Sequence, residues 1–176
     1  MSELRKATTD HPYFITISVV GWVDVFTRQS YNDVVIQSLA FCIHNKNLEI
    51  YAYVIMPSHI HMIVRSPQAT LPSILRDFKS FTAKKIISII KHEPGESRKE
   101  WMLHVFEYHA RFRKQNEKYM FWQKTNYRIE LNYPSIFHQK MDYIQNNPVK
   151  AGYVTDSNTW YYSSSCSQSP LKMINT

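Results

Sequence analysis

Apolar positions divide the first third of the chain into short elements of two periodicities. The β-branched and aromatic run "YFITISVVGWV" (13–23) predicts a strand. In "YNDVVIQSLAFCIHNKN" (31–47), apolar residues recur at the spacing of one helix face. "LEIYAYVIM" (48–56) and "HIHMIVR" (59–65) predict two further strands, and Pro57-Ser58 between them marks a turn.

The middle of the chain begins with a long helix and then loses its pattern. "LPSILRDFKSFTAKKIISIIK" (71–91) predicts a helix, and Pro72 is tolerated in its first turn. "HEPGESRKE" (92–100) breaks this helix. From 101 to 117 the sequence is mixed and weakly patterned, so we assign no element there.

Two more elements complete a known order. "YMFWQKTNYRIEL" (119–131) predicts a strand and its exit, and "PSIFHQKMDYIQNN" (134–147) predicts a helix that stops at Pro148. The first six elements follow β-α-β-β-α-β, the order of the ferredoxin-like α+β fold, with one antiparallel sheet and helices on one face. The last helix is a C-terminal addition. We expect a single domain over 1–176, with 155–176 as a C-terminal tail.

Composition narrows the class of protein. The 176 residues carry 21 Lys+Arg against 14 Asp+Glu, a net charge of +7, which favours a polyanionic partner such as nucleic acid. Three glycines and two cysteines argue against a glycine-rich phosphate loop, a disulfide framework and a cysteine zinc cluster. We expect a cytoplasmic protein, because the polar start is unlike a signal peptide and no stretch approaches the ~18 apolar residues of a membrane span.

A pair of histidines interrupts the apolar strand at 59–65. Side chains alternate faces along a strand, so His59 and His61 point the same way and Ile60 points to the other side. Two imidazoles at this spacing can converge on one metal ion, and neutral histidine is the commonest metal ligand. The alternative is that both are exposed polar residues on a half-buried strand.

The segment "MDYIQNNPVKAGYV" (141–154) contains the second candidate group. Tyr143 and Asn147 are four residues apart and therefore share a helix face. Taken alone, a tyrosine on a helix is more often a packing residue than a nucleophile. Asn147 precedes a proline, and asparagine is also a common helix terminator.

These segments together resemble a known family. "MPSHIHMIV" (56–64) resembles the His-hydrophobic-His motif of the HUH endonucleases, and "YIQNNPVKAGYV" (143–154) resembles the tyrosine block of single-tyrosine (Y1) transposases, the IS200-like and REP-associated enzymes. The resemblance spans about 12–165, and its supporting segments fall in the expected order: "FKSFTAKKI" (78–86), "FWQ" (121–123) and "WYYSSS" (160–165). Ser58 departs from the pattern, because relatives often have asparagine there.

The resemblance implies cleavage and rejoining of single-stranded DNA through a 5′-phosphotyrosine on Tyr143. It implies that His59 and His61 hold a divalent metal, Mg²⁺ or Mn²⁺, with a third ligand from the tyrosine helix. Asn147 is our first choice for that ligand and Gln145 the second, because a residue at i+2 points away from Tyr143.

Two basic segments with interspersed apolar and aromatic residues are candidates for the DNA surface, because cations can follow phosphates while rings stack on unpaired bases. The alternative for each is a solvated helix face or loop. Our candidates are Arg76, Lys79, Lys84, Lys85, Arg111, Arg113, Lys114, Trp122 and Lys124.

The expected partner is single-stranded DNA that forms a hairpin at an element end or repeat. Relatives include monomers and also dimers in which the tyrosine helix completes the partner's site, so a homodimer is one of two arrangements open here. Two other functions compete with this one. The first is a different metal hydrolase that adds His109 or Glu107 to the histidine pair, and the second is a catalytically idle DNA-binding protein derived from a transposase.

Overall fold

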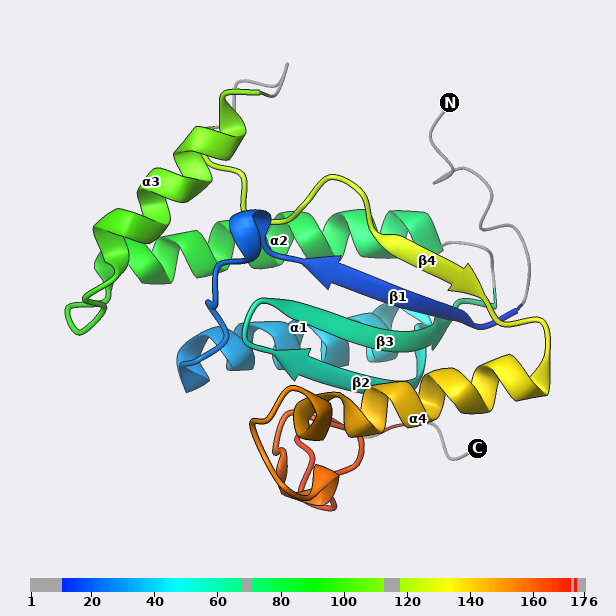
Figure 1. Cartoon of the computed structure of the whole chain (residues 1–176). Helices are drawn as coiled ribbons and strands as arrows, with labels where there is room; N and C mark the ends of the chain where they lie inside the picture. Colours follow the sequence, from blue (N-terminus) through cyan, green and yellow to red (C-terminus); the bar gives the residue numbers. More distant parts are fainter. Residues whose placement is uncertain (1–10, 68–70, 113–117, 172, 174–176) are drawn as a thin grey trace.

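The structure is a computed structural model that describes residues 11–67, 71–112, 118–171 and 173 (Figure 1). Its elements, in chain order, are β1 (Tyr13–Ser18), η2 (Val20–Trp22), α1 (Gln29–Lys46), β2 (Glu49–Met56), β3 (His59–Arg65), α2 (Leu71–His92), α3 (Lys99–Ala110), β4 (Tyr127–Glu130), α4 (Pro134–Lys150) and η3 (Ser157–Thr159). Within these ranges, none of the helices has the length and apolar character needed to cross a membrane.

Four antiparallel strands form one sheet in the order β2-β3-β1-β4. This strand order, with α1 between β1 and β2 and α2 between β3 and β4, confirms the predicted ferredoxin-like fold. Helices α1 and α2 lie on one face of the sheet, and α4 lies on the opposite face (Figure 1). The helix expected as an addition to the fold is therefore the element that covers the second face.

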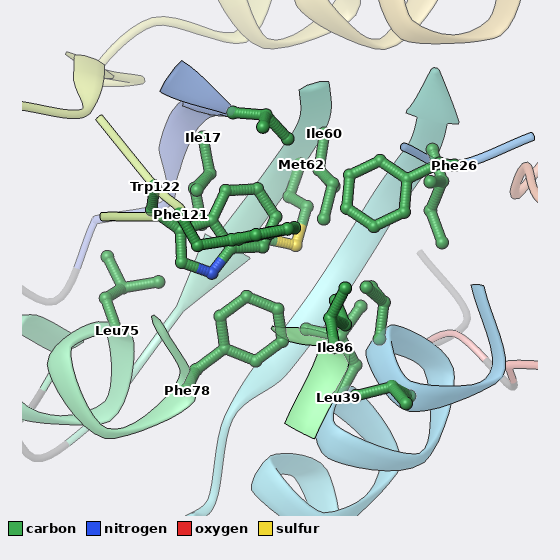
Figure 2. Close-up of a cluster of buried hydrophobic side chains, with 14 of the residues drawn as sticks. Ile17, Phe26, Leu39, Ile60, Met62, Leu75, Phe78, Ile86, Phe121 and Trp122 are labelled. Atoms are coloured by element: carbon green, nitrogen blue, oxygen red, sulfur yellow. The ribbon is translucent and has the colours of Figure 1, made fainter. Parts of the chain in front are cut away.

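Strand alternation divides the core into two clusters. Ile17, Ile60 and Met62 point toward α1 and α2, where they pack with aromatic side chains (Figure 2). On the other face, Phe14 and Ile63 pack with Ile144 of α4 in a smaller cluster. His59 and His61 are in step with Ile63, so they also face α4.

The first strand is shorter than predicted. It ends at Ser18 because the chain then turns through η2, where Gly21 has φ 62° and Trp22 has φ 55°. Val105 of α3 packs closely on this turn, and a Cβ built on Gly21 would lie 3.1 Å from its Cγ1. Only glycine takes both the left-handed backbone and this close approach without strain.

Two helices also differ from the prediction. Within the unassigned stretch at 101–117, α3 extends to Ala110 and buries only Met102, Phe106 and Ala110, a stripe of one residue per turn that gives a weak pattern. Helix α4 does not stop at Pro148 but continues to Lys150. A proline near a helix end removes one hydrogen bond, and the amides of Ala151 and Gly152 still bond to the carbonyls of Asn147 and Val149.

Residues 160–164 pack along the outer edge of β2. The Ile55 amide donates to the Tyr162 carbonyl at 2.9 Å, and the Ser164 amide donates to the Tyr53 carbonyl at 2.9 Å. The Trp160 indole N–H donates to the Ile55 carbonyl at 3.0 Å. These bonds fix the chain that follows α4 against the sheet, and so hold the C-terminal end of α4 in place.

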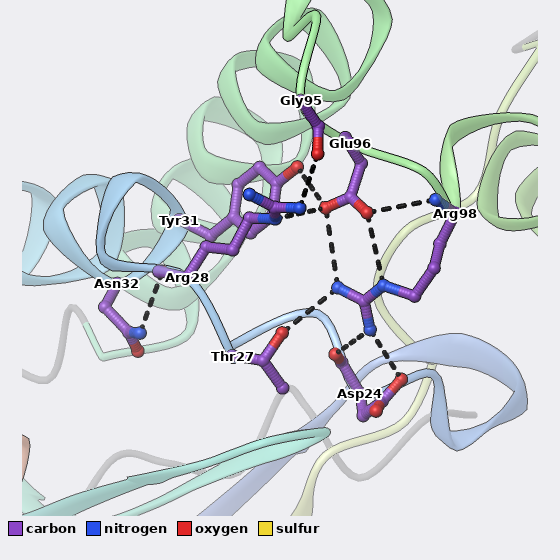
Figure 3. Close-up of polar contacts among 8 residues, drawn as sticks. All are labelled: Asp24, Thr27, Arg28, Tyr31, Asn32, Gly95, Glu96 and Arg98. Atoms are coloured by element: carbon purple, nitrogen blue, oxygen red, sulfur yellow. Dashed lines mark hydrogen bonds and ion pairs between the residues drawn. The ribbon is translucent and has the colours of Figure 1, made fainter.

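A buried carboxylate ties the loop before α1 to the loop before α3 (Figure 3). Glu96 is buried, and its Oε2 lies 2.9 Å from Arg28 Nε and accepts a hydrogen bond from the Tyr31 hydroxyl at 3.0 Å. Arg98 contacts its Oε1 at 3.2 Å and also binds Asp24. Burial raises the pKa of Glu96, but the hydrogen bonds from Arg98 and Tyr31 outweigh it and hold the pKa at about 2.

This carboxylate predicts a specific acid dependence of stability. Because its pKa falls from 4.5 to about 2 on folding, its contribution is complete above pH 4.5 and is lost as the pH falls toward 2. We expect Glu96→Gln to lower the free energy of unfolding by about 3 kcal/mol at pH 7, since it leaves two arginines with a neutral partner. The difference from wild type should shrink below pH 4.5 in urea titrations.

Asp77→Asn is the matched control, because Asp77 pairs with Lys46 and Arg76 on the surface. It should cost less than about 1 kcal/mol. A Glu96→Gln protein as stable as wild type at pH 7 would show that the cost of burying the carboxylate cancels its ion pairs.

Candidate functional site

The histidine pair lies at the start of β3, on the sheet face that α4 covers. His61 is 5% exposed and His59 is partly exposed. Their rings meet edge to face, with centroids 4.7 Å apart. Phe14 stacks on His61 with a centroid distance of 5.5 Å and so limits its rotation. The pattern of alternation therefore brings the two imidazoles together.

Each imidazole is hydrogen-bonded through Nδ1. The Thr16 hydroxyl lies 2.8 Å from His61 Nδ1, and the Ser58 hydroxyl lies 3.1 Å from His59 Nδ1. When each Nδ1–H donates to its hydroxyl, each Nε2 presents a lone pair, which is the arrangement of metal-binding histidines. Burial lowers the pKa of both rings, to about 3 for His61, where the charges of His59 and Lys140 add to the effect. Both are therefore neutral at pH 7.

Tyr143 lies beside this pair. Its ring centroid is 5.2 Å from that of His61 and 5.8 Å from that of Phe14. The next residue, Ile144, is fully buried and anchors α4 to the sheet, while the Tyr143 side chain is 36% exposed. One chain thus brings its own tyrosine to its own histidines, on a side where solvent and a substrate can reach the ring.

Two lysines that were not among the predicted site residues flank this tyrosine. Lys140 Nζ lies 5.6 Å from the centroid of the Tyr143 ring and 4.9 Å from that of Phe14, and Lys150 Nζ lies 6.0 Å from the Tyr143 ring. They stand three residues before and seven after Tyr143, so the i−3 and i+7 spacing was the signal in the sequence.

Helix geometry separates the two candidates for a third donor. At about 100° per residue, Asn147 falls between Tyr143 and the buried position of Ile144, whereas Gln145 lies about 200° from Tyr143. In the described part of the chain, no three His, Cys, Asp or Glu side chains gather as a metal site. His109 and Glu107, which lie in that part, are not grouped with the histidine pair, so the structure lends no support to the alternative hydrolase site.

A groove with a volume of about 640 Å³ runs between α2 and the segment 118–126. Five of the candidate DNA-binding residues line it: Arg76, Lys79, Lys84, Trp122 and Lys124. Its other lining residues include Lys91, Lys118 and Tyr119, and Lys91 Nζ lies 4.5 Å from the Tyr119 ring centroid. The cations of two distant segments thus meet in one concave surface.

The individual candidates differ in their surroundings. Lys79 Nζ donates to the Gln123 carbonyl at 2.7 Å and to Asn126 Oδ1 at 2.9 Å, so this lysine fixes the wall of the groove. Lys85 and Arg111 are exposed, and neither is part of the groove lining. The other two, Arg113 and Lys114, lie outside the described residues.

Trp122 is a correction to the predicted DNA surface. It is only 3% exposed, packs against Phe26 and Phe78, and donates its indole N–H to Thr82 Oγ1 at 2.9 Å (Figure 2). Its ring faces cannot stack on a base while they form part of the core. The prediction for Trp122 was wrong because residues 121–123 pair with residues 18–20, and this pairing turns the Trp122 side chain into the core.

Comparison with known proteins places this geometry in context. The family model for IS200-like transposases matches residues 13–107, which contain both histidines and end before Tyr143. A REP-associated tyrosine transposase solved with a REP hairpin is similar in fold, with a TM-score of 0.60 and 22% identity over 93% of this chain and 82% of that one. A candidate transposase from Deinococcus radiodurans R1 gives a TM-score of 0.48 at 16% identity, over 83% of this chain and 97% of that one.

No curated protein matches the chain. The family match nevertheless covers more than half of the 176 residues, and it includes the strand with the histidine pair. With the ferredoxin-like sheet and the paired imidazoles, it shows that this chain belongs to the IS200-like transposase family.

Proposed function

We propose that this transposase cleaves and rejoins single-stranded DNA, with Tyr143 as the nucleophile and a divalent cation at His59 and His61. The observation that carries the proposal is the contact between the Tyr143 and His61 rings, 5.2 Å apart at an accessible edge of α4. A phosphate bound to the histidine pair would lie within reach of the phenol. Since one chain supplies both groups, a monomer would suffice for cleavage. We expect this monomer to be a single domain that acts in the cytoplasm.

The reaction is an exchange of phosphodiester bonds. The Tyr143 oxygen attacks the phosphorus in line, an O–P bond to the phenol forms, and the P–O3′ bond breaks. The phenol proton leaves and the released 3′ oxygen gains a proton. The 5′-phosphotyrosine conserves the bond for rejoining, so no nucleotide triphosphate is required.

The residues present fit a divalent cation. Both imidazoles are neutral, and in the tautomer whose Nδ1–H donates to the Thr16 or Ser58 hydroxyl, each Nε2 is available to bind a cation. Asn147 would supply an oxygen from the Tyr143 side of α4, with Gln145 as the second choice. Such a set of nitrogen and oxygen donors suits Mn²⁺ or Mg²⁺. A bound cation would polarise the scissile phosphate and offset charge in the transition state.

Lys140 and Lys150 would assist the nucleophile. A free tyrosine has a pKa of about 10, so it must lose its proton as it attacks. The two ammonium groups lie within 6.0 Å of the ring centroid, so their positive charge would act on an anionic phosphate bound beside the ring. They would also attract the phosphate before the reaction.

The groove between α2 and 118–126 would bind the DNA outside the cleavage site. Its arginine and lysines can follow a phosphate backbone, and Tyr119 can stack on a base. A structural neighbour is a transposase bound to a REP hairpin, which supports a hairpin of single-stranded DNA as the partner.

Replacing the nucleophile tests the proposal directly. Phe keeps the ring contacts of Tyr143 but removes the attacking oxygen, so Tyr143→Phe should fold and bind DNA and form no covalent adduct. The assay uses single-stranded DNA labelled on the 3′ side of the cut, because the phosphotyrosine retains that fragment on a denaturing gel. Tyr133→Phe is the control, because Tyr133 is exposed before α4 and should form the adduct as wild type does.

A labelled adduct that persists in Tyr143→Phe would identify another nucleophile. Wild-type protein that binds the DNA without any adduct would instead favour the idle DNA-binding protein.

The metal site gives a second prediction. His59→Ala and His61→Ala should each abolish cleavage and Mn²⁺ binding measured by calorimetry, and leave DNA affinity within about 3-fold. Thr16→Val should weaken Mn²⁺ binding by about 10-fold or more, because it removes the hydroxyl that orients His61. His44→Ala, at the exposed end of α1 and outside the groove lining, is the control. Undiminished cleavage in EDTA would contradict the metal site.

The groove gives a third prediction. Replacing Lys84 and Lys91 by alanine should reduce the salt dependence of hairpin affinity, lowering the slope of log K against log salt by about 1.4. Lys85→Ala should leave the slope unchanged, because Lys85 is exposed on the same helix outside the groove lining. Fluorescence anisotropy at several salt concentrations measures the slopes, and equal slopes for the double variant and wild type would exclude this groove as the DNA surface.

A further inference from the structure

An exposed tryptophan stands next to the histidine pair. Trp22 lies in η2, directly after β1, and its side chain is 59% exposed. Its ring meets the His59 ring edge to face, with centroids 5.5 Å apart and an angle of 76° between planes. The Trp22 ring is therefore accessible beside the two candidate metal ligands, and it is not part of either core cluster.

The backbone holds this ring in place by an unusual conformation. Trp22 has φ 55°, in the left-handed region that bulky residues rarely adopt, and Gly21 before it has φ 62°. Such conformations persist only where the surroundings enforce them. Here the Val19 amide donates to the Ser58 carbonyl at 2.9 Å and the Val20 amide donates to the Phe121 carbonyl at 2.9 Å. The turn is thereby tied to the residue that precedes His59.

Four rings form a row across the site. Tyr143 contacts His61, His61 contacts His59, and His59 contacts Trp22, with centroid distances of 5.2, 4.7 and 5.5 Å. Tyr143 and Trp22 are therefore at opposite ends, and the histidine pair lies between them. In an in-line displacement, the attacking and leaving oxygens are on opposite sides of the phosphorus. An attack directed along this row would place the leaving 3′ oxygen toward Trp22.

We infer that Trp22 is a stacking platform for an unpaired nucleobase, that of the nucleotide immediately 5′ of the scissile phosphate. This inference rests on the proposed function, because it takes Tyr143 as the attacking group. An exposed indole face offers stacking to any base, so the platform would position the DNA without selecting a sequence. It would hold the nucleotide whose 3′ hydroxyl is released, and so keep that hydroxyl ready for rejoining.

The test combines protein variants with abasic DNA. Wild type, Trp22→Ala, Trp22→Phe and Trp101→Ala are each assayed for adduct formation and DNA affinity. The substrates are intact single-stranded DNA and the same DNA abasic at the nucleotide 5′ or 3′ of the cut. Trp101 is the matched control, since it is 52% exposed on α3.

Trp22→Ala should lower kcat/KM on intact DNA by about 10-fold, and the 5′ abasic site should lower that of wild type by a similar factor. The two losses should not multiply, because each removes the same stack. Trp22→Phe should recover part of the loss, and Trp101→Ala should match wild type.

Losses that multiply would overturn the inference, because they would mean that Trp22 acts only by supporting His59. Coupling to the 3′ abasic site alone would overturn it as well. Failure of the proposed function is a separate result: wild type would then form no adduct on intact DNA. In that case the DNA affinities of Tyr143→Phe proteins with and without the Trp22 substitution are measured on intact and abasic DNA. Losses of affinity that do not multiply for Trp22 and one abasic position would still report stacking.

Discussion

The register between β1 and β3 determines which face of the sheet carries the histidine pair. In this antiparallel pair, His61 is opposite Thr16 and His59 is opposite Ser18, while Ile60 is opposite Ile17. A slip of one residue would turn the imidazoles toward α1 and α2 and turn the isoleucines toward α4. The apolar core against α1 and α2 therefore enforces the register, and the polar face opposite it follows.

The same constraint explains what could be predicted from the sequence. Period-two alternation needs only neighbouring residues, so it identified both the strands and the shared face of His59 and His61. The family resemblance extended this to Tyr143, and the structure brings that ring to His61. The spacing of four residues likewise indicated that Asn147 shares a helix face with Tyr143.

The features that escaped prediction depend on contacts between distant segments. The sequence around Trp122 has the composition of an exposed basic run, yet the Trp122 side chain is buried, because its backbone pairs with Val19 and its indole N–H bonds to Thr82. The turn at Gly21 ends β1 inside a run that otherwise suits a strand, because α3 packs on it. Pro148 indicated a helix end, but the carbonyls around it are satisfied by later amides. None of these contacts is visible in local periodicity.

The chain that follows α4 has a consequence for solubility. Strand β2 is at the edge of the sheet, and its segment Tyr51–Met56 is β-prone, apolar and without charge. An uncovered edge of this kind presents unpaired amides and carbonyls to other molecules and can nucleate intermolecular sheets. Tyr162 and Ser164 occupy those backbone groups at Ile55 and Tyr53. Residues 160–164, which hold α4 in place, therefore also protect the edge of the sheet from intermolecular strand pairing.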